Sequence, residues 1–167
     1  MLTEKTAAHS VAVFPCKGCR ILQKLIFLTD AFFQAYADCS ELEKKRTRPY
    51  VRIGVILGGV LWAVPLRSHI THNHVIWTDR EHQCGIDFTK AVAVSNPELY
   101  ISTARPHLRP NEFEQLKRIN QHTLEQKLLQ YMRVYRRAKA APDAPHNAAL
   151  LRYSTLQYFE DYMTELE

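Results

Sequence analysis

The chain has 167 residues, of which 46% are hydrophobic and 23% charged, enough for one globular domain with its own core. No run of about 18 apolar residues occurs, so no membrane-spanning helix or membrane partner is expected. The N-terminus lacks the long apolar core of a secretory signal, which predicts a cytoplasmic location. A net charge of +5 and an isoelectric point of about 9.1 are compatible with an anionic partner such as nucleic acid.

The first segment, residues 1–20, shows no hydrophobic period and is interpreted as an N-terminal extension to a single domain over residues 21–167. It carries Cys16 and Cys19 in a CxxC pattern. Three interpretations stay open: free thiols, a redox pair, or half of a structural zinc site completed by histidines further along the chain. We favour free thiols, so neither a metal nor a cofactor is predicted.

The apolar residues 25–28 predict a short strand, followed by a helix that Thr29 or Asp30 would cap through its side-chain oxygen. Phe32 and Phe33 then fall at the spacing of the inner face of that helix. The helical pattern fades near Ser40, so a short strand and a short helix are expected before the basic part of the chain.

Five cations follow within nine residues: Lys44, Lys45, Arg46, Arg48 and Arg52. The aromatic residue Tyr50 lies in the same stretch. A solvated loop and strand edge would explain the charges, but cations interleaved with an aromatic side chain also suit phosphates and unstacked bases. We therefore predict that this stretch contacts RNA.

Two apolar runs, 50–57 and 60–66, flank Gly58-Gly59, a strong signal for a β-hairpin because a tight primed turn requires positive φ. The second run leads directly into a group of polar and basic side chains: Arg67, Ser68, His69, His72 and His74. A hairpin would therefore hold guanidinium, hydroxyl and imidazole groups on a stiff support, and the chemistry is expected there.

Further short strands are predicted at 75–77, at 86–94, where Lys90 falls, and at 99–101. Short antiparallel strands that bury one face tend to close into a small barrel. We expect an α+β fold built on a small, SH3-like antiparallel β-barrel with packed helices.

The C-terminal third changes to a helical period. Asn111 with Glu114 resembles a capping box and predicts one long helix. The last turns of this helix carry Arg133, Arg136 and Arg137. After two prolines, Asn147 could cap a second helix, whose inner face would use one of two sets: Leu151, Tyr158 and Tyr162, or Leu156, Phe159 and Met163.

The grouped side chains suit metal-free RNA cleavage, in which the ribose 2′-hydroxyl attacks the adjacent phosphorus. Carboxylates do not cluster as a magnesium site requires, and no glycine-rich phosphate loop or GxSxG motif is present. Arg48 and Arg67 would bind the phosphate, Ser68 would orient it, and His69 or His72 would move protons. The predicted RNA-binding residues are Lys44, Lys45, Arg46, Tyr50, Arg52, Lys90, Arg133, Arg136 and Arg137.

The run RPYVRIGVILGGVLWAVPLRSHI, followed by GIDFTKAVAV, resembles the toxins of type III toxin–antitoxin systems, the ToxN/AbiQ-like endoribonucleases. The histidine-rich loop is most similar to the TenpN-like branch, and the entry KLIFLTDAFFQAY also resembles the family's start. The resemblance covers about residues 24–165. Family members carry a threonine before the serine and a catalytic lysine two places after it, where this chain has Arg67 and Ile70.

This resemblance implies a MazF/Kid-like barrel and metal-independent cleavage that leaves a 2′,3′-cyclic phosphate and a 5′-hydroxyl. It implies two RNA partners, cellular mRNA substrates and a small pseudoknot-like antitoxin RNA that the toxin cuts from a repeat array. The antitoxin RNA would inhibit the toxin in a ring-like protein–RNA complex. Roles in phage defence and plasmid maintenance are further expectations from the family.

Two other interpretations stay open. The basic surface could belong to a non-catalytic RNA-binding module, which would retain RNA without cutting it. Alternatively, Cys16, Cys19 and nearby histidines could form a zinc-stabilised domain that binds nucleic acid or protein.

Overall fold

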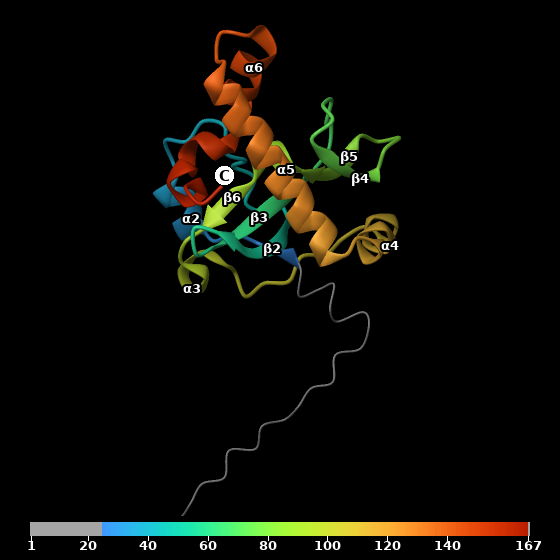
Figure 1. Cartoon of the computed structure of the whole chain (residues 1–167). Helices are drawn as coiled ribbons and strands as arrows, with labels where there is room; N and C mark the ends of the chain where they lie inside the picture. The colour runs from blue at the N-terminus through green and yellow to red at the C-terminus, as the bar shows by residue number, and fades with distance from the viewer. Residues whose placement is uncertain (1–24, 167) are drawn as a thin grey trace, which may run out of the picture.

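The computed structural model describes residues 25–166 and shows an α+β fold with one six-stranded antiparallel sheet (Figure 1). The strands are β1 (Leu25–Ile26), β2 (Tyr50–Leu57), β3 (Val60–Arg67), β4 (Val75–Asp79), β5 (Cys84–Asp87) and β6 (Val92–Val94). Their order is β1-β2-β3-β5-β4, and β6 also pairs with β3. Within the described residues the sheet stays open, so the predicted closure into a barrel is not observed.

The hairpin predicted around Gly58-Gly59 is confirmed. These glycines have φ values of +61° and +65° and connect β2 to β3, which pair from Tyr50↔Pro65 to Leu57↔Val60. Strand β3 is central, and its Trp62 is fully buried. The hairpin therefore forms the middle of the sheet. Arg48 and Arg67 lie at its open end, opposite the Gly58-Gly59 turn.

The strand predicted at 86–94 is interrupted by the 3₁₀ turn η1 (Phe88–Lys90). The Asp87 carboxylate caps this turn by accepting a hydrogen bond from the backbone N–H of Thr89 at 2.9 Å. The interruption lets β3 pair with β6 through residues 61–63 and with β5 through residues 66–67. One predicted strand therefore becomes two short strands that pair with different parts of β3.

The strand predicted at 99–101 is wrong, because the chain forms the short helix α3 (Pro97–Tyr100) there. The side chain of Asn96 caps α3 by accepting from the backbone N–H of Leu99 at 3.2 Å. Only Ile101 adds a single β-bridge, to Leu28. The Asn96 cap therefore favours a helix here, although the apolar residues 99–101 suggest a strand.

The N-terminal helix α2 (Asp30–Ala35) is confirmed, and Thr29 caps it. The predicted long helix is instead two helices, α4 (Pro110–Arg118) and α5 (Gln121–Ala140). Asn120 lies between them and caps α5 by accepting from the backbone N–H of Thr123 at 2.7 Å. No helix of residues 25–166 has the length and apolar character needed to cross a membrane.

Replacing Asn120 by alanine is expected to lower the free energy of unfolding by about 1 kcal/mol, because one backbone donor of α5 loses its acceptor. Urea denaturation measures the change. Asn111→Ala is the matched control, since Asn111 lies inside α4 and does not cap it. An equal loss of stability in both variants would contradict the assignment of Asn120 as the cap.

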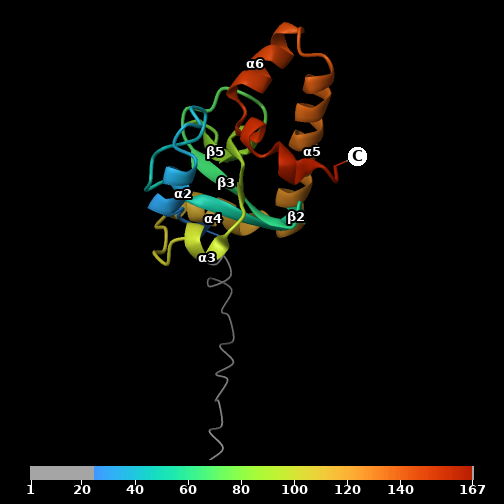
Figure 2. The same ribbon diagram turned by 90° about the vertical axis from the view of Figure 1, so that its left-hand side faces the viewer.

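The C-terminal part folds as α6 (Pro145–Tyr153) followed by two 3₁₀ turns, η2 (Thr155–Tyr158) and η3 (Glu160–Met163). Figure 2 shows α6 folded back beside α5. Asn147 does not cap α6, because the helix has already begun at Pro145 and the Asn147 amide donates to the Ala141 carbonyl at 2.8 Å. Of the two predicted inner faces, the second is buried: Leu156, Phe159 and Met163.

Candidate functional site

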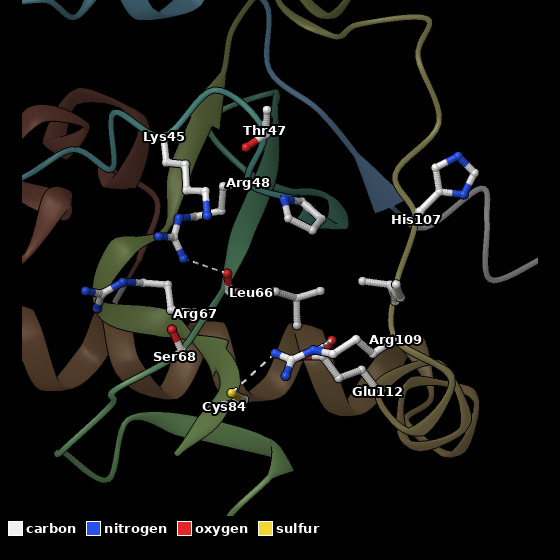
Figure 3. A pocket seen from close by; sticks show the side chains of 12 residues that line it. Lys45, Thr47, Arg48, Leu66, Arg67, Ser68, Cys84, His107, Arg109 and Glu112 are labelled. Atoms are coloured by element: carbon white, nitrogen blue, oxygen red, sulfur yellow. Dashed lines mark hydrogen bonds and ion pairs between the residues drawn. The ribbon is translucent and has the colours of Figure 1, made fainter. Parts of the chain in front are cut away.

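A cavity of about 230 Å³ lies at the open end of the β2–β3 hairpin. Its wall brings together the segment before β2, the end of β3, the start of β5 and the segment that leads into α4. Figure 3 shows Arg67 and Ser68 on one side of the cavity and Arg109 on the other. The polar groups on its wall include Lys45, Arg48, Arg67, Ser68, His107 and Arg109.

The hairpin itself places Arg48 beside Arg67. Antiparallel pairing continues past the end of β2, because the Leu66 N–H donates to the Pro49 carbonyl at 2.9 Å. The Arg48 guanidinium in turn donates from Nη1 to the Leu66 carbonyl at 2.9 Å. Two guanidiniums that are 19 positions apart in the sequence therefore share one end of the sheet.

Both guanidiniums are tied to carboxylates. Glu43 pairs with Arg48 at 3.2 Å and with Arg67 at 2.5 Å. The other side of Arg67 pairs with Asp87 at 2.5 Å. The Asp87 side chain has an exposed fraction of 0%, and those of the other three residues lie between 16% and 24%. Burial strengthens such pairs relative to surface pairs, so this network fixes both arginines in place.

Asp87 is the buried centre of this network. It accepts hydrogen bonds from the Thr89 hydroxyl at 2.6 Å and the Thr89 backbone, and His72 Nε2 lies 3.3 Å from its Oδ1. Burial acts to raise the pKa of Asp87, but the hydrogen bonds from His72, Thr89 and Arg67 outweigh it and lower the pKa below its usual value. The carboxylate is therefore ionised at neutral pH.

The cavity wall keeps an excess of positive charge despite these pairs. Four permanent cations (Lys45, Arg48, Arg67 and Arg109) line it, against the single carboxylate of Glu112. Glu43 and Asp87 stand behind the wall, so four cations face three carboxylates. Arg109 pairs with Glu112 at 3.1 Å, yet 63% of its side chain stays exposed. The remaining positive charge favours an anion in the cavity.

Ser68 and His69 lie side by side at the exposed edge of this cavity. His69 Nδ1 is 3.1 Å from the Ser68 hydroxyl oxygen, and Ser68 lines the cavity. His69 has a φ of +59°, an unusual conformation for a residue with a side chain. The next residue, Ile70, is buried and its N–H donates to the Gln83 carbonyl at 3.1 Å, which fixes the turn. Strained backbone held by a buried neighbour is common at functional sites.

Of the five predicted catalytic residues, Arg48, Arg67 and Ser68 line this cavity, His69 lies beside Ser68 without lining it, and His72 lies elsewhere. His72 contacts the far side of Asp87 and lines a second cavity with His74. The predicted proton transfer by His72 at the Ser68 cavity is therefore unsupported by the geometry. Asp87 separates His72 from Arg67.

Two predicted RNA-binding residues have structural roles instead. The ring of Tyr50 is fully buried, so it cannot stack on a base in this fold. Lys90 donates to the carbonyls of Glu41 at 2.9 Å and Tyr153 at 2.8 Å, with the Glu41 carboxylate at 3.4 Å. The Lys90 ammonium is already hydrogen-bonded and the side chain is only 12% exposed. Lys90 therefore links segments of the fold and is not placed to bind a phosphate.

The other predicted RNA-binding cations lie on the surface but not in one place. Lys44 donates to the Ala37 carbonyl at 2.9 Å, Arg46 pairs with Asp30, and Arg52 is exposed on β2. Lys45 lines the cavity beside Ser68. The three predicted arginines near the end of α5 are exposed, and they divide between cavities: Arg136 lines one beside Tyr135, Arg137 lines the one beside His72, and Arg133 is at neither.

Sequence reasoning missed His107 and Arg109 as members of the site. Both lie on the segment between Pro106 and Pro110, which has no regular secondary structure. The two prolines around His107 and Arg109 indicate a stiff loop, but they do not indicate that the loop reaches the site.

Comparison of this chain with protein-family models, curated proteins and solved structures gives no match. Cys16 and Cys19 lie outside the described residues, so their predicted chemistry stays a prediction. Within residues 25–166, no three His, Cys, Asp or Glu side chains are grouped as metal ligands would be.

Proposed function

We propose that this protein is an endoribonuclease that cleaves RNA by attack of a ribose 2′-hydroxyl on the adjacent phosphorus, without requiring a metal ion. The observation that carries the proposal is the Ser68–His69 pair at the edge of a cavity with excess positive charge. RNA supplies its own nucleophile, so the protein needs only to bind the phosphate, move protons and stabilise charge.

The Ser68–His69 contact supports a separate proposed role for each residue. If Nδ1–H of His69 donates to the Ser68 oxygen, Nε2 keeps a lone pair that can remove the 2′-hydroxyl proton. The Ser68 hydroxyl hydrogen then stays free to bind a non-bridging phosphate oxygen. The 2′-oxygen forms a bond to phosphorus, the bond to the 5′-oxygen breaks, and a proton is delivered to the leaving oxygen. The products are a 2′,3′-cyclic phosphate and a 5′-hydroxyl.

The cations have two kinds of role in this reaction. Arg48 and Arg67 are fixed by Glu43, so they supply a positioned positive field behind the phosphate. Lys45 and Arg109 are exposed at the cavity and can contact the phosphate oxygens directly. His107 is the one histidine among the described residues that line the cavity, and it is our candidate for protonating the leaving oxygen.

The wider biological role follows from the resemblance described above. We propose a toxin of a type III toxin–antitoxin system that cuts cellular mRNA and is inhibited by a small structured antitoxin RNA. That RNA would be processed by the same site and held in a ring-like complex. A MazF/Kid-like shape and a cytoplasmic location are part of the same proposal.

The test is cleavage of a long mixed-sequence RNA transcript by the full-length protein and two variants. His69→Ala is expected to lower the cleavage rate at least about 100-fold, the usual minimum for a general base. Ser68→Ala is expected to lower it about 100-fold, because a hydrogen bond to the developing charge is lost. Product ends are mapped as cyclic phosphate and 5′-hydroxyl, with excess chelator present throughout.

His122→Ala is the control for the histidine change, because His122 is exposed on α5 and does not line the cavity. Cleavage by both site variants at the rate of the parent would reject the mechanism. RNA retention with no cleavage by the parent would instead favour the non-catalytic RNA-binding module. Stoichiometric zinc, with loss of fold on chelation, would favour the zinc-stabilised domain.

A further inference from the structure

A second, larger cavity of about 650 Å³ lies between α5, α6 and the loop that carries His72 and His74. Figure 2 shows the two helices side by side. The volume falls within the range of about 300–1,000 Å³ that is common for small-ligand sites. The proposed cleavage reaction takes place at the other cavity, so this one has no assigned role.

The floor of the second cavity is apolar and aromatic. Tyr131 lies beneath it, with its ring 4.9 Å from the ring of His74 and its hydroxyl donating to the Ser154 hydroxyl at 2.8 Å. Val134 and Leu150 supply aliphatic surface from the two helices. Burial, reinforced by the neighbouring His72, lowers the pKa of His74, so its ring is neutral at pH 7. A flat ligand would therefore meet neutral aromatic and aliphatic walls.

Within residues 25–166, the rim of this cavity carries one permanent cation, Arg137. Arg137 from α5 and His146 from α6 lie on the rim and are exposed. No aspartate or glutamate occurs among the described residues that line the cavity. The charge on the rim therefore favours an anionic group, whereas the floor favours an uncharged ring.

Asp87 lines neither cavity but contacts a residue from each. His72 lines the second cavity and lies 3.3 Å from Asp87 Oδ1, while Arg67 lines the first and pairs with Asp87 Oδ2 at 2.5 Å. One buried carboxylate thus contacts a lining residue of each cavity.

We propose that the second cavity receives one unstacked RNA base, with its phosphate held at the rim by Arg137. Aromatic and aliphatic walls with a nearby cation are the common means of holding single-stranded bases. This inference rests on the proposed function for its choice of RNA as the ligand, but it requires no cleavage. It assigns base preference to α5 and α6 and the chemical step to the hairpin.

The experiment measures binding of AMP, GMP, CMP and UMP to the full-length protein by NMR titration, with ribose 5-phosphate as the probe that lacks a base. At least one nucleotide is expected to bind tenfold more tightly than ribose 5-phosphate. Ala149→Trp, which places an indole in the cavity, is expected to weaken that binding at least tenfold. Ala148→Trp is the matched control, because Ala148 is exposed on the same helix and does not line the cavity.

Arg137→Gln is a second variant that does not alter the cavity floor, and it is also expected to weaken nucleotide binding about tenfold. Arg118→Gln on α4 is its control for net charge. Equal binding of ribose 5-phosphate and every nucleotide, or equal effects of Ala149→Trp and Ala148→Trp, would overturn the inference.

The same titration in Ser68→Ala separates this inference from the nuclease proposal. Nucleotide binding that survives Ser68→Ala and is lost in Ala149→Trp supports the base cavity, whether or not the protein cleaves RNA. Cleavage that depends on Ser68 while Ala149→Trp leaves nucleotide binding unchanged overturns the base cavity and leaves the nuclease standing.

Discussion

Asp87→Ala is expected to lower the free energy of unfolding by about 3–5 kcal/mol, the usual cost of removing one partner from a buried ion pair. The carboxylate has an exposed fraction of 0% and accepts from Arg67 and from Thr89, with His72 Nε2 within 3.3 Å. Its loss would leave the Arg67 guanidinium with one carboxylate instead of two and would remove the cap of η1.

Chemical denaturation measures this change, with Asp161→Ala as the control because Asp161 is exposed. The control is expected to stay within about 0.5 kcal/mol of the parent. Asp87→Asn keeps the shape and one acceptor, so it should be less destabilising than Asp87→Ala. A loss below about 1 kcal/mol for Asp87→Ala would show that the buried network does not stabilise the fold.

The pH dependence of stability follows from the same residue. The pKa of Asp87 is lower in the folded chain than its usual value of 3.8, so the folded state binds this proton less readily than the unfolded state. Its contribution to stability is therefore complete above the unfolded pKa and is lost as the pH falls through the folded pKa. Denaturation between pH 7 and pH 2 should show a smaller acid-induced loss in Asp87→Asn than in the parent.

Gly58→Ala is expected to lower the free energy of unfolding by about 2–4 kcal/mol. Gly58 has a φ of +61°, which costs an alanine about 1–2 kcal/mol. A Cβ at this position would also lie 2.5 Å from the backbone oxygen of Tyr162, which forces a shift between the hairpin turn and η3. Both effects act in the same direction.

The neighbouring glycine separates the two effects. Gly59 has nearly the same φ, +65°, but a Cβ there would meet no atom within 4 Å. Gly59→Ala should therefore cost only the backbone term, about 1 kcal/mol. Urea denaturation of both variants gives the difference. Equal losses would show that the contact between Gly58 and Tyr162 does not constrain the turn.

The hairpin and most of the candidate site could be predicted because their signals are local. Gly58-Gly59 specifies a tight turn, and pairing from Tyr50↔Pro65 then places Arg48 next to Arg67 without information from the rest of the chain. Ser68 and His69 follow directly in sequence. Burial of Tyr50 was not predictable, because alternation along a strand does not tell which face another element covers.

The helix and strand predictions were wrong where a single polar side chain capped a helix or turn inside an apolar pattern. Asp87 caps a 3₁₀ turn inside an apparent strand, Asn96 caps α3, and Asn120 starts a new helix inside a continuous helical period. Each cap satisfies backbone donors that the pattern assigns to another element. His107 and Arg109 reach the site only through the path of the chain between β6 and α4, which no local signal specifies.

The position of Glu43 has a consequence for how an anion would bind. The Glu43 carboxylate bridges Arg48 and Arg67, at 3.2 Å and 2.5 Å. Because Glu43 belongs to the same chain, it competes with any incoming anion at a high effective concentration. Glu43 keeps the two guanidiniums aligned and at the same time weakens their attraction for a bound anion. In the proposed reaction, the same carboxylate would ease release of the cleaved strand.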